Sequence, residues 1–77
     1  MSAAVLCRRA VPISSAELIE LRGEQSDAGD VVIAIECLVT RQGEVIARGP
    51  VFDIPAQAAR KLAAALNALA ADLGVAP

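Results

Sequence analysis

The sequence predicts an α+β fold: an antiparallel meander sheet of three to four strands, followed by one C-terminal helix packed on one face of the sheet. Three observations predict it. Residues 31–40 are a long β-branched run, a Gly-containing turn at 41–44 separates this run from a second apolar strand, and residues 56–73 are rich in Ala and Leu. At 77 residues the chain is expected to form a single domain over 1–77.

The run at 31–40 is the predicted central strand, within a strand at 31–41, because it is apolar on both alternating faces. Its odd positions form one row: Val31, Ile33, Ile35, Cys37 and Val39. Its even positions form the other: Val32, Ala34, Glu36, Leu38 and Thr40. One helix can cover only one row, so the even row is left as a candidate contact surface.

Two strands are predicted before it, at 5–11 and 17–23. The first suits a sheet edge, since Pro12 has no N–H to donate. The second is ambiguous, because Ser14 and Glu17 match a capping box for a short helix, whereas Ile19 and Leu21 alternate as in a strand. The polar segment 23–30 favours the strand, since it leads directly into the next strand as a hairpin loop does.

The last strand is predicted at 44–54, after a hairpin whose two loop residues are Gln42 and Gly43. Regular pairing would place Val45 opposite Thr40. It would also place Ala47 opposite Leu38, Ile46 opposite Val39, and Arg48 opposite Cys37 on the odd face. We expect Gly49 and Pro50 to bend the strand without shifting its register, which keeps Phe52 and Ile54 on the odd face.

The helix is predicted over 55–73, with Pro55 in its first turn and Gly74 after its end. Leucines spaced by four, three and four residues form one stripe that should lie on the odd row: Leu62, Leu66, Leu69 and Leu73. The other side carries a smooth strip of Ala64, Ala68 and Ala71 beside Lys61, where a second helix could approach.

Composition favours association. The chain is 56% hydrophobic and 21% charged, with a mean hydropathy of +0.55, and a monomer of this size would leave much apolar surface in water. The net charge of -2 and the pI near 4.9 do not favour binding of nucleic acid.

No apolar run reaches the length of a membrane helix and no signal-like segment precedes Cys7, so we expect a cytoplasmic protein. In that compartment Cys7 and Cys37 should be reduced, although a disulfide would be possible if the two lay on neighbouring strands.

Catalytic chemistry has few groups to use, since the sequence contains no His, Trp or Tyr. Ser-His-Asp and Cys-His sites are therefore excluded. Two isolated cysteines do not make a zinc site, and the glycines fit no phosphate-binding loop. We therefore expect no enzyme, no catalytic residue, no metal and no cofactor.

Glu36 interrupts the apolar even row. We expect it to face solvent; a charge pair with an Arg of this or a partner chain, and a role in binding a ligand, are the alternatives. Arg48 is expected to extend off the sheet edge so that its charge stays in water.

Nucleic-acid binding is the alternative function. Five arginines could line one side of a sheet and follow a phosphate backbone: Arg8, Arg9, Arg22, Arg41 and Arg48. From Val31 to Leu69, strands, a Gly-Glu turn and a C-terminal helix resemble the single-strand-binding transcriptional coactivators in element order, which implies binding of single-stranded nucleic acid. The acidic pI, the single Lys61 and the lack of a stacking aromatic beyond Phe52 favour solvated arginines instead.

The sequence thus predicts a small, non-enzymatic protein-binding module. We expect it to be a homodimer that acts as a regulator or inhibitor by occupying a surface of an unidentified partner protein. Its size and its Ala-, Arg- and Val-rich composition would suit a bacterial gene, including one carried by a phage or mobile element. The predicted dimer or partner interface consists of Val32, Ala34, Glu36, Leu38, Thr40, Val45, Ala47, Lys61, Ala64, Ala68 and Ala71.

Overall fold

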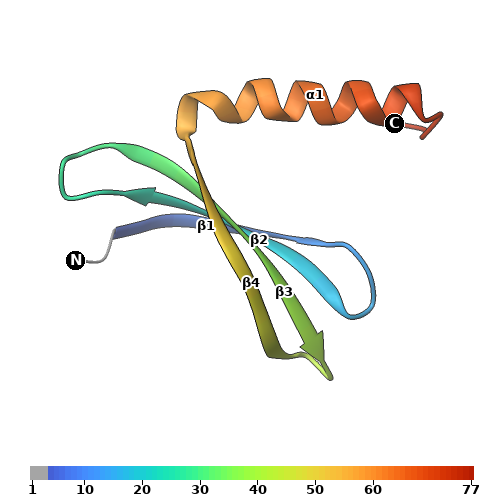
Figure 1. Ribbon diagram of the computed structural model, residues 1–77, viewed down its shortest axis with the longest axis horizontal. Coiled ribbons are helices and arrows are strands. Elements are labelled where there is room, and N and C mark those ends of the chain that lie inside the picture. The colour runs from blue at the N-terminus through green and yellow to red at the C-terminus, as the bar shows by residue number, and fades with distance from the viewer. Residues whose placement is uncertain (1–3) are drawn as a thin grey trace.

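The computed structural model describes residues 4–77, which form a four-stranded antiparallel sheet in the order β1-β2-β3-β4 and one C-terminal helix (Figure 1). The strands are β1 (Ala4–Pro12), β2 (Glu17–Gln25), β3 (Val31–Arg41) and β4 (Glu44–Pro55). A short 3-10 helix, η1 (Ala56–Ala58), leads into α1 (Ala59–Asp72). The predicted α+β class and meander order are confirmed.

The segment between β1 and β2 explains the ambiguity at Ser14 and Glu17. The Ser14 hydroxyl donates to Glu17 Oε1 at 3.3 Å and accepts the Ala16 N–H at 3.2 Å, while the Ile13 N–H donates to the Glu17 carbonyl at 2.9 Å. The residues that resemble a capping box therefore close a tight turn, and β2 begins at Glu17.

The β3–β4 hairpin has the predicted two-residue loop. Gln42 and Gly43 have φ angles of 53° and 81°, and Arg41 pairs with Glu44. Positive φ at both central residues is the requirement of a type I′ turn, whose twist matches that of the flanking strands.

Beyond this turn the predicted register is wrong. Thr40 pairs with Val45 as expected, but Val39 pairs with Ala47, which leaves Ile46 as an extra residue in β4. Such a bulge shifts every later β4 residue by one position relative to β3.

The consequence for Arg48 is a change of face. It pairs with Leu38 rather than Cys37, and so it lies on the even face, where Ala47 was expected. The predicted placement of Arg48 on the odd face is therefore wrong.

A second irregularity follows at Gly49 and Pro50, which together oppose the single residue Cys37. The prediction that these residues leave the register unchanged is also wrong. A Cβ on Gly49 would lie 3.3 Å from the Cys37 carbonyl oxygen, so glycine suits this close approach. Because the two shifts together amount to two positions, Phe52 opposes Ile35 and stays on the odd face as predicted.

Burial on β3 differs from expectation, because the even row is the more buried of the two. Ala34 is 0% exposed, Leu38 3% and Glu36 5%, whereas no residue of the odd row is fully buried. Ala34 lies between Arg22 of β2 and Asp53 of β4 in the register. Long side chains of the adjacent strands, rather than the helix, cover this row.

The helix lies on the side of the odd row, but at a distance that leaves its leucines open. Leu62 is 41% exposed and Leu73 is 80% exposed, with Leu66 and Leu69 between these values. The chain stays in β4 up to Pro55 and the α-helix begins only at Ala59, later than predicted. No helix of the described residues is long and apolar enough to cross a membrane.

Candidate interaction surfaces

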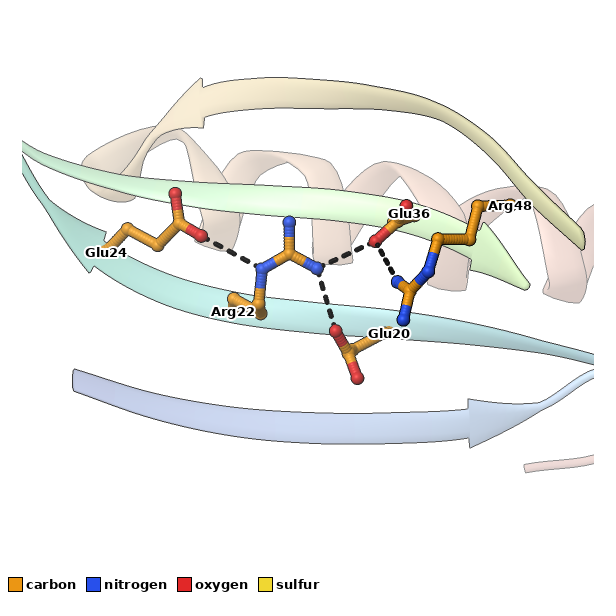
Figure 2. A network of polar contacts seen from close by, with 5 residues as sticks. All are labelled: Glu20, Arg22, Glu24, Glu36 and Arg48. Atoms are coloured by element: carbon orange, nitrogen blue, oxygen red, sulfur yellow. Dashed lines mark hydrogen bonds and ion pairs between the residues drawn. The ribbon is translucent and has the colours of Figure 1, made fainter. Parts of the chain in front are cut away.

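A network of five charged side chains lies on the even face, on the opposite side of the sheet from the helix (Figure 2). Three come from β2, one from β3 and one from β4: Glu20, Arg22, Glu24, Glu36 and Arg48. Alternation along β2 places the first three on one face, and the bulge in β4 brings Arg48 to the same face.

Arg22 is the centre of this network. Its Nη1 donates to Glu20 Oε1 at 2.7 Å and to Glu36 Oε1 at 2.8 Å, and its Nε donates to Glu24 Oε2 at 2.9 Å. Glu20 and Glu36 are directly opposite each other on β2 and β3, a pairing of like charges that destabilises a sheet unless a cation lies between them. The guanidinium provides that cation.

Glu36 accepts a second ion pair from Arg48 Nη1 at 3.2 Å. The Glu36 side chain is 7% exposed and that of Arg22 is 15%, whereas Arg48 remains 59% exposed. The expectation that Glu36 faces solvent is wrong, and the alternative of a charge pair with an Arg of the same chain is what the structure contains.

The network shifts the acid–base properties of its members. The hydrogen bond from Arg22 lowers the pKa of Glu36 below its usual value; burial opposes this, and the charges of Arg48 and Arg22 add to it. The pKa of Arg22 is raised, first by its hydrogen bond to Glu24 and then by those to Glu36 and Glu20. Within residues 4–77 no buried side-chain N or O atom lacks a hydrogen-bond partner. The network therefore connects β2, β3 and β4 through its ion pairs.

The predicted interface residues do not form one surface. In the even row three are buried and two are half-buried, and Ala47 has moved to the odd face with Val39. Helical periodicity places the exposed alanine strip on the side of α1 turned away from the sheet. The even row and the alanine strip thus point in opposite directions, separated by both the sheet and the helix. The buried members are Ala34, Glu36 and Leu38; the half-buried ones are Val32 and Thr40; the exposed ones are Val45, Ala47, Lys61, Ala64, Ala68 and Ala71.

The surface that sequence reasoning missed is an apolar groove between the odd face and the first half of α1. It has a volume of about 690 Å³, and all eleven lining residues are aliphatic. All four strands or their ends and the helix contribute to it: Val11, Ile13, Ile19, Leu21, Ile33, Ile35, Ile54, Ala59, Leu62, Ala63 and Leu66. The sequence identified both walls, the odd row and the leucine stripe, but the prediction assumed that each covered the other.

The two cysteines lie apart on the sheet. Cys7 pairs with Gly23 and Cys37 with Ile19, so different parts of β2 separate them, and both are free cysteines at exposed residues. Among residues 4–77 no group of three or more His, Cys, Asp or Glu side chains is arranged to hold a metal ion.

The order of strands and C-terminal helix that underlies the resemblance to the single-strand-binding coactivators is present in the structure. Two of the arginines considered for nucleic-acid binding, Arg22 and Arg48, are paired with carboxylates. No family model matches the chain, and neither a curated protein nor a solved structure does.

Proposed function

We propose that the protein is a small, non-enzymatic binding module that works as a homodimer, with a second copy covering the apolar groove. The observation that carries this proposal is the accessible surface. The chain exposes 6017 Å², whereas a monomeric globular protein of 7.9 kDa exposes about 4,400 Å². The excess is about 1,600 Å² per copy, or about 3,200 Å² for two copies. This total lies within the range of about 2,000–5,000 Å² that obligate homodimer interfaces bury.

The shape supports the same conclusion. The radius of gyration is 14.3 Å, compared with about 11.5 Å for a compact domain of this length. The helix projects along one side of the sheet instead of closing on it (Figure 1). A second chain that filled the space beneath the helix would make such a protomer compact.

The chemistry of the open surface favours a second copy. Phe52 is 67% exposed and Ile13 56%, and both belong to the face that carries the groove or its rim. Leu69 and Leu73 continue the leucine stripe past the end of the groove, so they are available to enter the groove of the other copy. A two-fold arrangement would use the same apolar patch on both chains, as symmetric dimers do.

Association through this face would leave the even face and the edges of the sheet outward. We propose that the dimer presents these surfaces to another protein and acts as a regulator or inhibitor by occupying a surface of it. A bacterial or phage origin belongs to the same proposal and is supported by the Ala-, Arg- and Val-rich composition. A cytoplasmic location is proposed with it.

Light scattering with size-exclusion chromatography tests the dimer. At micromolar concentration we expect twice the chain mass of 7.9 kDa. Leu66→Glu places a charge in the groove and should give the monomer mass, since Leu66 is a lining residue and already 58% exposed, which allows the fold to persist.

Ala68→Glu is the matched control, because it adds the same charge two residues away on the outward side of α1, and it should remain dimeric. A monomeric wild type would refute the proposal. Dissociation by Ala68→Glu but not by Leu66→Glu would move the interface to the alanine strip.

A further inference from the structure

The two edges of the sheet differ in how open they are to another strand. Within residues 4–77, β1 and β4 each pair with a strand on one side only. β4 carries two register shifts as well as Pro50 and Pro55, features that protect an edge from further pairing. β1 has one irregularity between Val5 and Cys7, and from Cys7 to Pro12 its pairing with β2 is regular. All nine residues of β1 are exposed. The open edge is therefore β1.

The alternation of backbone direction along β1 identifies which of its N–H and C=O groups point away from the sheet. The Ile13 N–H bonds the Glu17 carbonyl, so residues of odd number in this stretch face β2. Because the backbone groups of successive residues alternate in direction, those of Arg8 and Ala10 point away from the sheet. Pro12 has the same orientation as Arg8 and Ala10, so its missing N–H removes no hydrogen bond between β1 and β2.

The outward edge carries two adjacent arginines. The Arg9 Nη1 donates to the Arg8 carbonyl at 2.8 Å, so a side chain occupies a position that a strand partner would take. Within residues 4–77, neither Arg8 nor Arg9 forms an ion pair, in contrast to Arg22 and Arg48. Adjacent strand residues point to opposite faces, so positive charge flanks the edge on both sides.

We propose that β1 binds an extended, acidic segment of another protein, which adds to the sheet as a fifth strand. The backbone groups of Arg8 and Ala10 would hydrogen-bond the incoming chain, and its carboxylates would pair with Arg8 on one face and Arg9 on the other. This inference names a partner for the binding module proposed above. It does not depend on dimerisation.

A second copy of the chain fits this edge poorly. Antiparallel pairing of two β1 strands about their centres would bring Arg8 and Arg9 close to the same residues of the copy. Like charges opposite each other on a sheet are destabilising, so the edge selects an acidic partner over itself.

Fluorescence anisotropy with short labelled peptides tests whether charge pairs with Arg8 and Arg9 contribute to the binding. The probe is a peptide of alternating Glu and Val, and its counterpart has Lys in place of Glu. At low salt we expect the wild type to bind the Glu peptide about tenfold or more tightly than the Lys peptide, as two charge pairs allow. The double variant Arg8→Glu/Arg9→Glu should reverse this preference. Arg60→Glu/Lys61→Glu changes the net charge equally on the helix and should leave the preference unchanged.

Ala10→Pro tests the backbone term, because it removes an outward N–H without touching the β1–β2 ladder. We expect it to weaken binding of the Glu peptide about tenfold, while Ala10→Val, which keeps the N–H, should bind as the wild type does. Unchanged far-UV circular dichroism would show that both variants remain folded.

Equal binding of the two peptides, or no binding of either, would overturn the proposal. So would full binding by Ala10→Pro, which would leave only a diffuse charge attraction. Binding of a labelled oligothymidylate in place of the Glu peptide, lost in the Arg8/Arg9 variant, would assign the edge to phosphate instead. A monomeric mass by light scattering combined with the expected peptide pattern would refute the dimer alone and leave this inference in place.

Discussion

Replacing Arg22 with Met would remove the guanidinium that three carboxylates share while keeping an unbranched side chain about as long as the aliphatic stem of arginine. Glu20 and Glu24 would lose the only cation within ion-pair distance in residues 4–77, and Glu36 would keep only Arg48. Removing one partner from a buried ion pair costs about 3–5 kcal/mol. Because Arg22, Glu20 and Glu24 are 15%, 21% and 17% exposed and Glu36 keeps Arg48, we expect a loss below this range, about 2 kcal/mol of unfolding free energy.

Urea unfolding followed by circular dichroism at pH 7 and one fixed protein concentration measures this loss. Arg48→Met is the matched control. Arg48 is 59% exposed and makes a single contact to Glu36, so its removal should cost less than about 1 kcal/mol. Equal losses in the two variants, or a loss below about 1 kcal/mol for Arg22→Met, would show that the network is solvated and does not hold the sheet together.

Three further predictions concern Glu36, the buried Leu38 and the two cysteines. Because the pKa of Glu36 is lowered in the folded state, its stabilising contribution is complete above the unfolded value of about 4.5 and is lost as the pH falls through the folded value. The urea midpoint should therefore fall on acidification from pH 5 to 3, and fall less in Glu36→Gln. Leu38→Ala, at a side chain that is 3% exposed, should lower the unfolding free energy by about 2–3 kcal/mol. Val45→Ala, at 44% exposure, should change it by less than about 0.5 kcal/mol in the same urea experiment. Both Cys7 and Cys37 should react with a thiol reagent in the native protein; one or no reactive thiol would contradict their free, exposed state.

The strand order could be predicted because the sequence signals for it are local. The β-branched run of β3, the turn at Gln42 and Gly43, and the alternation of Ile19 and Leu21 each depend on neighbouring residues only. The sequence signals for the helix were equally local, although the 3-10 helix η1 replaces the predicted first turn of the α-helix. Such signals define elements and their apolar sides.

Which surfaces meet could not be predicted in this way. The leucine spacing identified the apolar side of α1 but not its distance from the sheet, which depends on how the chain leaves β4 at Pro55. The bulge at Ile46 changes which β3 residue opposes Arg48, and no residue type there signals it. The sequence favoured a solvent-facing Glu36 because no helix was left to cover the even row. The pairing of β2 that brings Arg22 to Glu36, and the shift in β4 that brings Arg48 to the same face, depend on contacts between strands that local signals do not specify.

The two bulges of β4 also determine where the chain can change its length. Ile46 has no opposite residue, and Gly49 and Pro50 share one, so losing a residue at either place leaves the later pairs with β3 in position. Losing a residue between Val51 and Ile54 would instead turn the side chains on one side of the deletion to the opposite face of the sheet. Among homologous chains, single-residue insertions and deletions in β4 should therefore fall at position 46 and at positions 49–50.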